Sequence, residues 1–552
     1  MAFGTVMSAT ISGINVEMIN VEADVSNGLP MFSMVGYLSS EVKEAGERVR
    51  TALKNSGFEY PVKKIIINLS PATIRKRGAI FDLPIALSIM VSAGQITQEK
   101  LENILVVGEL GLDGKLLKVN GLLAIVMEAK RRGITTFIVP KENQQEGDLV
   151  EGVKVHSFVW IREVYDFLNP IKKKENQEDF KNKKSQEEND CGRTKSRQAN
   201  VEKERGEARG KDGVERVKPS EIQEEVGNRV VDFSDIYGQR AVKRAVEIAV
   251  VGGHNVLLIG PPGSGKSLIA QAIPSILPPL ENDEMLEITK IYSIMGLLKE
   301  GNPLITLPPF RSVHQTTTKA SLVGGGKIPR VGEITLAHKG ILYLDELPEF
   351  SRTAIEALRQ PLEDKGIQIT RTTGSYCFPA DFILVCAMNP CPCGMYPDLE
   401  KCTCSPTQIS NYLGKISQPF LDRIDICIEV PRLKYADLQK GGRNKGEERE
   451  ESSITVRDRV RKAREKQQKR NRGESMNANL TPREMGRHCS LEDEGEKLME
   501  QAYHKLNLTA RSYHKILKVA RTIADMDESE YIQPKHIREA IAYRTLDKKY
   551  WR

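Results

Sequence analysis

Long hydrophobic runs are missing from this sequence of 552 residues. Its longest nearly uncharged stretches, residues 83–94 and 248–265, are too short or too rich in Gly and Pro for a membrane helix of about 20 apolar residues. The first 20 residues also lack a basic segment followed by an apolar one, which is the pattern of a secretory signal. We therefore expect a cytoplasmic protein without a membrane segment.

Net charge and cysteine are also scarce. The 81 Lys and Arg residues against 74 Asp and Glu give a net charge of only +7, so a nucleic-acid surface requires local clustering of cations. Nine cysteines in a chain of this length do not make a disulfide scaffold, and we expect them to be reduced. An apolar content of 39% beside 28% charged residues predicts sizeable cores together with some solvated chain.

Charged segments divide the chain. Residues 170–227 carry charge at about every second position and contain Phe180 as their single aromatic residue, which predicts a disordered linker or, alternatively, a nucleic-acid-binding arm. A second polar and basic stretch, residues 436–475, is expected to be a connector. The length predicts three or four folding units of about 150 residues each. The domains are expected at residues 1–169, 228–435 and 476–552.

Hydrophobic patterns predict an α/β multidomain protein. Buried-strand patterns at residues 64–69 and 104–108, with a helix at 124–132, predict an α+β or α/β domain before the linker. After it, short apolar runs alternate with helical stretches, as in a parallel sheet with crossover helices. Residues 476–552 show apolar residues at helical spacing, so we expect a small helical domain there.

The strongest motif is a phosphate-binding loop. A strand-like run at residues 256–259 leads directly into Gly-Pro-Pro-Gly-Ser-Gly-Lys-Ser. In such a loop, backbone N–H groups surround the phosphates, the lysine reaches the β- and γ-phosphates, and the last hydroxyl binds Mg²⁺. The expected cofactors are therefore ATP and Mg²⁺. The predicted nucleotide-binding residues are Gly260, Pro261, Pro262, Gly263, Ser264, Gly265, Lys266 and Ser267.

Two further strand-like runs end in polar residues. The run at residues 341–344 ends at Asp345 and Glu346. We expect Asp345 to share the Mg²⁺ with Ser267 and Glu346 to polarise the attacking water, which predicts hydrolysis of ATP rather than binding alone. The run at residues 383–388 ends at Asn389, which either positions that water or caps a turn.

Four cysteines lie close together as two Cys-x-Cys pairs. Four thiolates can converge on one tetrahedral Zn²⁺, which leaves no open position and is therefore structural. Buried thiols without a metal and a redox pair are the alternatives. The predicted zinc ligands are Cys391, Cys393, Cys402 and Cys404. Three others, Cys377, Cys386 and Cys427, lie in or beside apolar strand-like segments and are expected in a core.

Longer strings carry a resemblance to a known family. They include AVEIAVVGGHNVLLIGPPGSGKS, PFRSVHQTTTKASLVGGG, PRVGEITLAHKGILYLDELPEF, LRQPLEDKGIQITR, NPCPCG and LDRIDICIEV. With them, nearly the whole chain outside the two charged stretches resembles the Mg-chelatase-like AAA+ ATPases of the ComM/YifB type. The resemblance implies that Asn389 is a sensor 1 residue, that Arg423 is a finger reaching a neighbouring subunit's γ-phosphate, and that Arg511 is the sensor 2 arginine of a helical lid. From the residues alone, a surface ion pair is the alternative for each arginine. A finger shared between subunits implies a closed ring, most often a hexamer.

Residues 1–169 resemble the Lon-protease type of domain, which has a ribosomal-S5-like fold. The matching strings are RGAIFDLPIA and VGELGLDGKL. A Ser-Lys peptidase of this type would need its nucleophile near Asp82 and its lysine near Leu123. Because an acid and an apolar residue stand there, we expect substrate binding or assembly instead of proteolysis. The basic residues at 75–77 are expected in a solvated loop.

The resemblance implies a motor acting on single-stranded or branched DNA, namely a branch-migration helicase that aids integration of incoming DNA during natural transformation and homologous recombination. An ATP-dependent protein-remodelling motor and a metal-chelatase-type motor without DNA are the alternatives. For the basic residues at 457–464, an exposed helix laced with acids is the alternative to a DNA contact. The candidate DNA contacts are Gly324, Gly325, Gly326, Lys327, Arg330, Arg457, Arg459, Arg461, Lys462 and Arg464.

Overall fold

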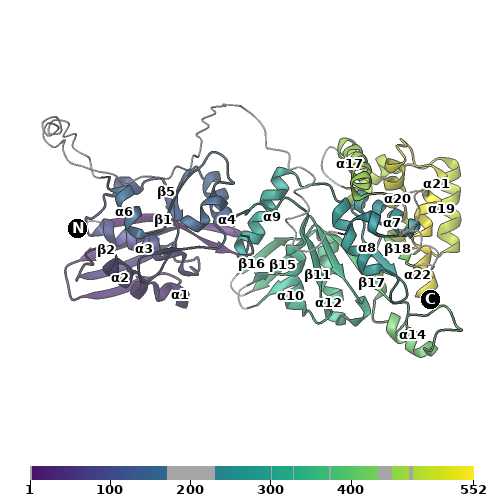
Figure 1. Ribbon diagram of the computed structural model, residues 1–552, viewed down its shortest axis with the longest axis horizontal. Helices are drawn as coiled ribbons and strands as arrows, with labels where there is room; N and C mark the ends of the chain where they lie inside the picture. The colour runs from purple at the N-terminus through teal and green to yellow at the C-terminus, as the bar shows by residue number, and fades with distance from the viewer. Residues whose placement is uncertain are drawn as a thin grey trace, which may run out of the picture.

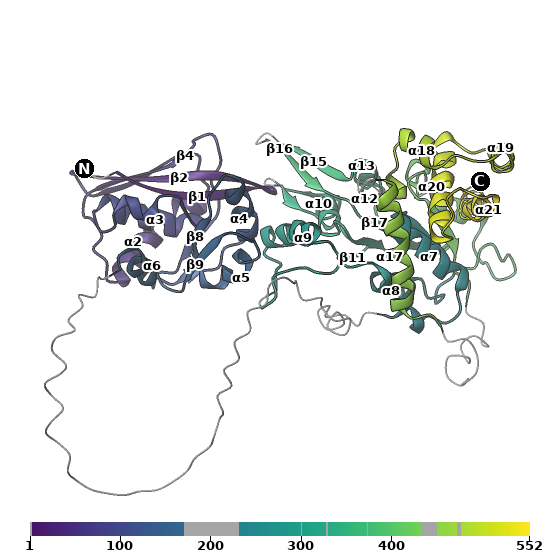
Figure 2. The same ribbon diagram turned by 90° about the horizontal axis from the view of Figure 1, so that it is seen from above.

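The computed structural model describes residues 3–170, 231–299, 301–326, 329–371, 374–432, 450–471 and 476–551. Figure 1 and Figure 2 show these residues as an elongated molecule, with an N-terminal domain at one end, a central domain, and a group of helices at the other end. Lys327 and residues 171–227 of the predicted linker at 170–227 lie outside the described residues. No helix within the described ranges combines the length and apolarity that crossing a membrane requires.

The N-terminal domain is a mixed sheet covered by helices. Within residues 3–170, the sheet has seven strands in the order β3-β4-β2-β1-β5-β8-β9. Its strands are β1 (Phe3–Ser12), β2 (Asn15–Ser26), β3 (Met31–Val35), β4 (Lys64–Ser70), β5 (Ile104–Val106), β8 (Thr136–Pro140) and β9 (Lys154–Phe158). A small hairpin joins β6 (Glu109–Leu110) to β7 (Leu116–Leu117). The helices are α1 (Ser40–Lys43), α2 (Ala45–Asn55), α3 (Asp82–Ser92), α4 (Leu122–Arg131), α5 (Gln144–Gly147) and α6 (Ile161–Leu168).

Two apolar clusters hold this domain together. Strands β1, β2 and β4 alternate buried and less buried residues, as expected of a sheet with faces of different polarity. Helices α2 and α3 share one cluster with those strands, and α3 is buried along its whole length. Helix α4 shares the second cluster with β5 and β8. The mixed α and β content predicted for this part of the chain is confirmed.

The central domain contains the parallel sheet predicted from the sequence. In the described part of residues 231–432, five strands pair in the order β11-β14-β17-β10-β18, all parallel. The strands are β10 (Val256–Ile259), β11 (Phe310–Val313), β14 (Ile341–Leu344), β17 (Ile383–Met388) and β18 (Ile426–Glu429). Every residue of β10, β14 and β17 is buried, which is why these strands are continuous apolar runs rather than alternating ones.

Helices and two hairpins connect these strands. The helices are α7 (Arg240–Gly252), α8 (Lys266–Ala272), α9 (Asn282–Ile294), α10 (Lys319–Val323), α11 (Glu333–Leu336), α12 (Arg352–Ala357), α13 (Arg359–Asp364), α14 (Pro406–Leu413) and α15 (Gln418–Leu421). One hairpin pairs β12 (Gly324–Gly325) with β13 (Arg330–Val331), and the other pairs β15 (Gly366–Arg371) with β16 (Gly374–Pro379).

The C-terminal part is helical, but it begins earlier than expected. Its helices are α17 (Ser453–Arg470), α18 (Pro482–His488), α19 (Asp493–Lys505), α20 (Ala510–Met526), α21 (Pro534–Ala542) and α22 (Thr545–Tyr550). Helix α17 lies within the predicted connector at 436–475. Its residues Val456, Val460, Ala463 and Gln467 are buried at helical spacing against the central domain. This narrow stripe was hidden in the sequence by the many basic residues around it.

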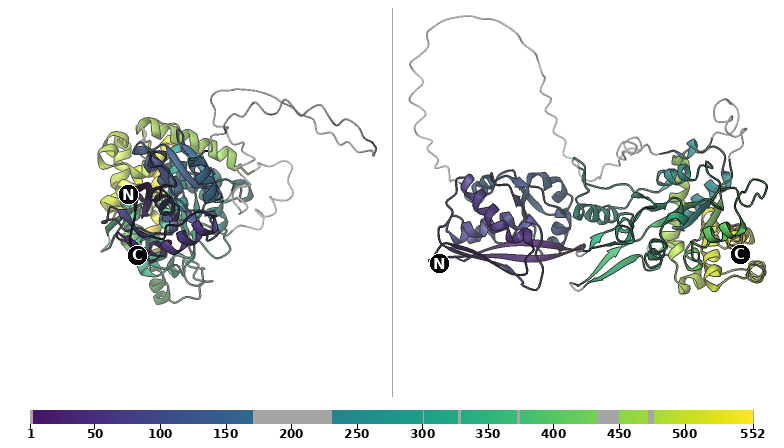
Figure 3. Two further views of the ribbon diagram at one scale, coloured as in Figure 1. Left: turned by 90° about the vertical axis from the view of Figure 1, so that its left-hand side faces the viewer. Right: turned by 90° about the horizontal axis from the view of Figure 1, so that it is seen from below.

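The N-terminal domain contacts the central domain through α4 and α9. The backbone N–H of Gly121 donates to the carbonyl of Ser293 (3.0 Å), and the Ser293 hydroxyl donates to the buried carboxylate of Glu146. The same carboxylate accepts from the N–H of Leu123 (2.8 Å). In addition, the turn between β1 and β2 reaches the β15–β16 hairpin (Figure 3). A Cβ atom at Gly13 would lie 3.0 Å from the Cδ1 of Tyr376. Both contacts join the N-terminal domain directly to the connections of the central sheet.

Candidate active site

Three neighbouring strands bring the predicted catalytic residues to one edge of the central sheet. Strand β17 pairs with β10 on one side and with β14 on the other. Because the strands are parallel, their carboxyl ends lie at the same edge. The phosphate-binding loop at 260–267, Asp345 and Asn389 follow these ends directly. The backbone N–H of Gly260 also donates to the carbonyl of Met388 (3.1 Å), which joins the loop to the strand that precedes Asn389.

Lys266 is held in this edge by oxygen atoms. Its Nζ donates to the carbonyls of Gly260 (2.7 Å) and Pro261 (3.0 Å) and to the Oδ1 of Asn389 (3.1 Å). Burial lowers the pKa of Lys266, and the carboxylates of Asp345 and Glu346 oppose this shift. A cation fixed in this way among strand ends is placed to bind the phosphates of a nucleotide. The structure therefore brings Lys266 and Asn389 together at this edge.

Ser267 and Asp345 offer oxygen ligands side by side. The Ser267 hydroxyl donates to the Oδ2 of Asp345 (2.9 Å), while the Oδ1 of Asp345 accepts from the N–H of Glu346 (2.9 Å). A hydroxyl and a carboxylate are the hard oxygen ligands that Mg²⁺ prefers, so the two residues fit this ion. Glu346 is exposed and has a φ of 50°, an uncommon backbone conformation for a residue with a Cβ atom. Such conformations cluster at functional sites.

The loop backbone has the conformations that glycine permits. Gly263 (φ 73°) and Gly265 (φ 92°) are both left-handed, where a Cβ atom is unfavourable. A Cβ atom at Gly260 would clash with the carbonyl oxygen of Val430, so this position needs glycine for space. The Ser264 hydroxyl is buried and has no hydrogen-bond partner in the described part of the chain. A buried hydroxyl of this kind beside a glycine turn fits a phosphate oxygen.

The two candidate arginines lie at the opposite edge of the sheet. Arg423 precedes β18, whose first residue pairs with Val256 at the start of β10. The four residues of β10 span about 13 Å at about 3.3 Å each, so Arg423 lies about that far from the phosphate-binding loop. Lys515 of α20 forms an ion pair with Asp425 (2.9 Å), which places the beginning of α20 and its Arg511 at the same edge. The chain therefore keeps these arginines apart from its own nucleotide site.

Both arginines bind one carboxylate that sequence reasoning missed. The Nη2 of Arg423 lies 2.8 Å from the Oε2 of Glu363, and the Nη2 of Arg511 donates to its Oε1 (2.5 Å). Within the described residues, no hydrogen bond or ion pair joins either arginine to the loop at 260–267, to Asp345 or to Asn389. The predicted assignment of both arginines to a nucleotide thus requires a second copy of the chain.

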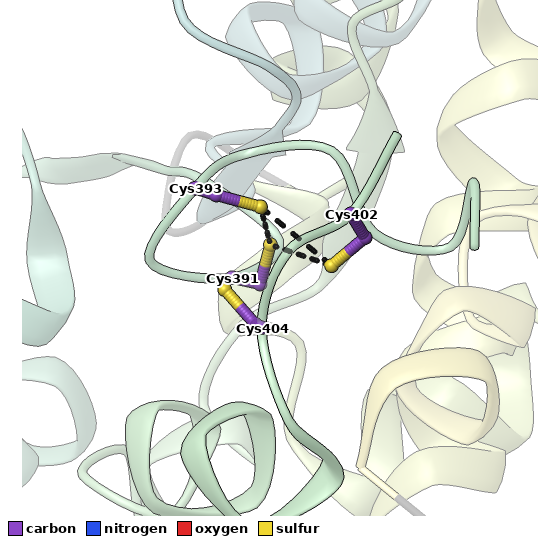
Figure 4. Close-up of side chains that lie close together, drawn as sticks. All are labelled: Cys391, Cys393, Cys402 and Cys404. Carbon is purple, nitrogen blue, oxygen red and sulfur yellow. Dashed lines mark hydrogen bonds between the residues drawn. The ribbon is translucent and has the colours of Figure 1, made fainter. Parts of the chain in front are cut away.

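The four clustered cysteines converge as predicted (Figure 4). Their sulfur atoms all lie within 4.8 Å of one another. The Sγ of Cys391 lies 3.4 Å from the Sγ of Cys393 and 3.8 Å from the Sγ of Cys402. The Sγ atoms of Cys393 and Cys402 are 3.6 Å apart. A tetrahedral Zn²⁺ with Zn–S bonds of about 2.3 Å holds its sulfurs about 3.8 Å apart, so the donor set fits the ion. Among the other predictions for cysteine, Cys386 and Cys427 are buried, but Cys377 is exposed on β16.

The cysteine cluster lies next to the nucleotide site. Cys391 and Cys393 follow Asn389 after β17, while Cys402 and Cys404 precede α14. A Cβ atom at Gly394 would clash with the ring of Pro262, so the cysteine loop packs directly on the phosphate-binding loop. A metal bound there would brace both the sensor strand and that loop.

The basic residues of α17 are mostly used inside the chain. Arg457 donates to the carbonyl of Ser275 (2.9 and 2.6 Å), and Arg464 donates to that of Val250 (2.7 Å). Arg459 pairs with Glu247 (2.8 Å) and Glu451 (2.7 Å). Burial lowers the pKa of Arg464 to about 10. These three arginines help to dock α17 on the central domain, and the predicted contact of this run with DNA stays a prediction.

The other two predicted DNA contacts on α17, Arg461 and Lys462, are exposed. Arg461 lies 3.3 Å from Glu465 and 3.8 Å from Asp458, and Lys462 is exposed. This arrangement matches the alternative of an exposed helix laced with acids.

The two hairpins carry exposed cations at their tips. Gly324, Gly325 and Arg330 lie in the β12–β13 hairpin, and Arg330 is exposed. At the end of β15, the Nε of Arg371 donates a hydrogen bond to the carbonyl oxygen of Gly326 (3.4 Å). Arg371 is not among the residues predicted from the sequence, although the strand-like alternation on both sides of Gly374 is a hairpin signal.

Asp82, which stands near the position where a Ser-Lys peptidase would need its nucleophile, has a structural role. The buried carboxylate of Asp82 accepts from the Nε (2.8 Å) and Nη2 (2.9 Å) of Arg48. Burial raises the pKa of Asp82, and Arg48 opposes this shift. Lys76, expected in a solvated loop, is instead buried and donates to the carbonyl of Pro71. Sequence spacing gave no sign of either contact.

Comparisons with known families cover most of the chain. Residues 232–438 match the family described as magnesium chelatase, subunit ChlI, and residues 450–544 match its C-terminal family. Residues 21–143 match the family described as subunit ChlI of Mg-chelatase. The C-terminal match begins at residue 450, so it includes α17.

Individual relatives extend over nearly the full length. The uncharacterized protein YifB of Escherichia coli K12 is 39% identical over 551 residues, covering 99% of this chain and 98% of the relative. The competence protein ComM of Haemophilus influenzae is 38% identical over 547 residues, with 99% and 98% covered. A magnesium-chelatase 67 kDa subunit of Chlorobaculum parvum is 25% identical over 237 residues, covering 40% of this chain and 31% of the relative.

Proposed function

Because the chain belongs to the Mg-chelatase-like AAA+ ATPase family that includes YifB and ComM, we propose that it is an ATP-hydrolysing motor that acts on DNA. The observation that carries this proposal is the convergence of Lys266, Ser267, Asp345 and Asn389 at one sheet edge while Arg423 and Arg511 lie at the other. This separation of the nucleotide residues from the arginines matches an ATPase whose active sites are completed by neighbouring subunits.

The edge of the central sheet that carries Lys266, Ser267, Asp345 and Asn389 is called the nucleotide edge. Each residue there has its own role in hydrolysis. Lys266 binds the phosphates, and Ser267 and Asp345 hold the Mg²⁺. When bound, Mg²⁺ neutralises charge on the β- and γ-phosphates. Glu346 orients the attacking water and takes its proton, because its carboxylate stands at the exposed end of β14. Asn389 holds the Lys266 ammonium on one side and the water on the other.

The arginines complete the site of a neighbour. An arginine supplied in trans stabilises the charge of the transferring phosphoryl group and is worth about 10³-fold or more in rate. A site that takes its arginine from the next copy demands a head-to-tail assembly, and a closed ring of six is the form we propose. The N-terminal domain, which resembles Lon-type domains without their dyad, would assist assembly or substrate binding in this ring.

We propose that the substrate is DNA in single-stranded or branched form. The biological role that we propose is movement of branch points in the cytoplasm, during homologous recombination of incoming DNA. Two features support it. A relative of 38% identity is named a competence protein, and the exposed tips of two hairpins bring Arg330 and Arg371 to the same region of the central domain. Arginines on such tips are suited to contact a phosphate backbone.

We also propose that Cys391, Cys393, Cys402 and Cys404 bind a structural Zn²⁺. Four thiolates close the coordination shell, so this ion would take no part in the reaction. Its role would be to hold the loop after Asn389 against the phosphate-binding loop.

ATP turnover with and without DNA tests the proposal. The purified protein is assayed alone and with single-stranded, duplex or branched DNA at two salt concentrations. We expect strong stimulation that weakens at high salt and is greatest with branched or single-stranded DNA. Turnover that no DNA changes would favour the alternatives, a protein-remodelling motor or a chelatase-type motor like the magnesium-chelatase subunit matched at 25% identity.

A further inference from the structure

Two guanidinium groups from distant parts of the chain meet on one side chain. Glu363 lies in the last turn of α13, Arg423 follows α15, and Arg511 lies in the first turn of α20. Each oxygen of the Glu363 carboxylate binds one arginine, at 2.8 Å for Arg423 and 2.5 Å for Arg511. The carboxylate therefore joins the central domain to the C-terminal helices at the point where the two guanidinium groups meet.

The two arginines are held to different degrees. The Arg423 side chain is 8% exposed, and its guanidinium also donates to the carbonyls of Arg359 (3.2 Å) and Pro419 (2.5 Å). The Arg511 side chain is 49% exposed, and Glu363 is the one partner that the described part of the chain gives its guanidinium. Arg511 thus depends on Glu363 for its position far more than Arg423 does.

Glu363 also makes the convergence electrostatically possible. Two guanidinium groups this close to a shared point repel each other unless an anion lies between them. A carboxylate with one oxygen for each arginine forms two charge-assisted hydrogen bonds and neutralises part of the repulsion. Without it, Arg511 would turn into solvent, because an exposed side chain with no partner gains rotamer freedom.

We propose that Glu363 is a positioning residue for ATP hydrolysis, which sets Arg423 and Arg511 as one pair for the nucleotide of the neighbouring subunit. The inference rests on the proposed function. Glu363 itself does not bind ATP. It keeps the two cations converged between turnovers, so that they meet a triphosphate without first reorganising.

Steady-state kinetics of Glu363→Gln and Glu363→Asp test this role. The amide removes the charge, and the shorter carboxylate cannot reach both arginines. We expect kcat to fall about tenfold in Glu363→Gln and less in Glu363→Asp, while the KM for ATP changes less than about twofold because the chain's own loop is intact. Glu494→Gln is the matched control, since Glu494 is an exposed partner of Arg538 (3.4 Å) far along the chain.

A merely structural ion pair would behave differently. An exposed pair contributes little to stability, so its loss would leave kcat unchanged or lower the melting temperature together with activity. Wild-type kcat in Glu363→Gln, or a kcat loss matched by loss of folded protein in both variants, would overturn the proposal.

Mixed assemblies locate the defect. Glu363→Gln subunits, with an intact loop but a disturbed arginine pair, are mixed with Lys266→Ala subunits, which have the reverse defect. The proposal predicts turnover above the sum of the two proteins, because Lys266→Ala subunits supply ordered arginines to their neighbours; an additive result contradicts it. Arg423→Ala distinguishes failure of the proposed function from failure of the role of Glu363. If Arg423→Ala hydrolyses ATP normally, the proposed site shared between subunits is wrong. If Arg423→Ala is inactive while Glu363→Gln has normal activity, only the role proposed for Glu363 is wrong.

Discussion

The Nζ of Lys266 donates a hydrogen bond to the Oδ1 of Asn389, 3.1 Å away, although 123 residues separate the two in the sequence. The pairing of β10 with β17 creates this contact, because parallel neighbouring strands deliver the residues after their carboxyl ends to one place. Under the proposed function, this bond joins the lysine that binds the phosphates to the residue that positions the attacking water, and it would link ATP binding to hydrolysis.

Loss of Lys266 or Glu346 should stop ATP turnover in different ways. Lys266→Ala removes the buried ammonium, so we expect ATP binding and hydrolysis to be lost together. Glu346→Gln keeps the loop, so ATP should still bind while hydrolysis falls by about 10²-fold or more. Binding of a fluorescent ATP analogue and steady-state turnover check both variants. Lys535→Ala, at an exposed pair with Asp527, should leave both unchanged. Full turnover in either active-site variant would place the active site elsewhere.

The hairpin arginines should separate DNA stimulation from basal turnover. Arg330→Ala and Arg371→Ala remove exposed cations of the two hairpins, so basal hydrolysis should persist while stimulation by DNA falls. Each lost phosphate contact should also reduce the salt dependence of DNA binding by about one unit of slope. Arg461→Ala on α17 is the control and should behave as the parent protein. Unchanged stimulation in both hairpin variants would remove these tips from the DNA path.

The cysteine cluster should contain about one zinc per chain. Metal analysis of protein purified without chelators or oxidants measures this directly. Cys402→Ser removes a ligand, so the zinc content should fall and the ATPase should lose thermal stability, because the loop packs on Pro262. Cys377→Ser replaces an exposed thiol outside the cluster and should keep the metal. Protein that holds no zinc under these conditions would retire the metal site.

His254 should make the central domain sensitive to acid. Burial lowers the pKa of His254 from 6.5 to about 4, Asp425 opposes the shift, and Lys518 and Lys515 add to it. The unfolded chain therefore binds this proton first as the pH falls, and stability is lost between about pH 6.5 and 4. The pKa of Asp425 is lowered to about 2, so its own contribution is lost only at lower pH.

Melting temperatures across that window check the prediction for His254. His254→Gln, whose amide can replace the hydrogen bond to Thr522, should show a shallower decline than the parent protein. His314→Gln, at an exposed position, should decline like the parent. Equal slopes in all three proteins would contradict the assignment of this acid sensitivity to His254.

Local motifs were enough to predict the nucleotide edge. The loop at 260–267 and the acidic pair after residue 344 each follow an apolar strand, and parallel pairing brings the ends of such strands together. The cysteine cluster was predictable for a similar reason, since a short loop can bring its four thiols into contact. In these cases, a few neighbouring residues determine the geometry.

Long-range contacts were not predictable in this way. Glu363 binds Arg423 and Arg511 because α13 and α20 pack at the same edge of the sheet, which no spacing in the sequence reveals. The basic residues of α17 looked like a surface for nucleic acid, but Arg457 and Arg464 find backbone carbonyls of the central domain instead. Lys76 is buried for the same kind of reason. A charged residue's role depends on what packs against it, and that information lies elsewhere in the chain.

Movement of a branch point in synthetic DNA tests the central claim most directly. A labelled three-strand junction is incubated with the protein, ATP and Mg²⁺, and the released strand is measured over time. The account predicts release that requires hydrolysable ATP and is absent in Lys266→Ala, which should still contact the junction through Arg330 and Arg371. Active ATP turnover with no strand release from the junction would contradict the claim that this ATPase moves DNA.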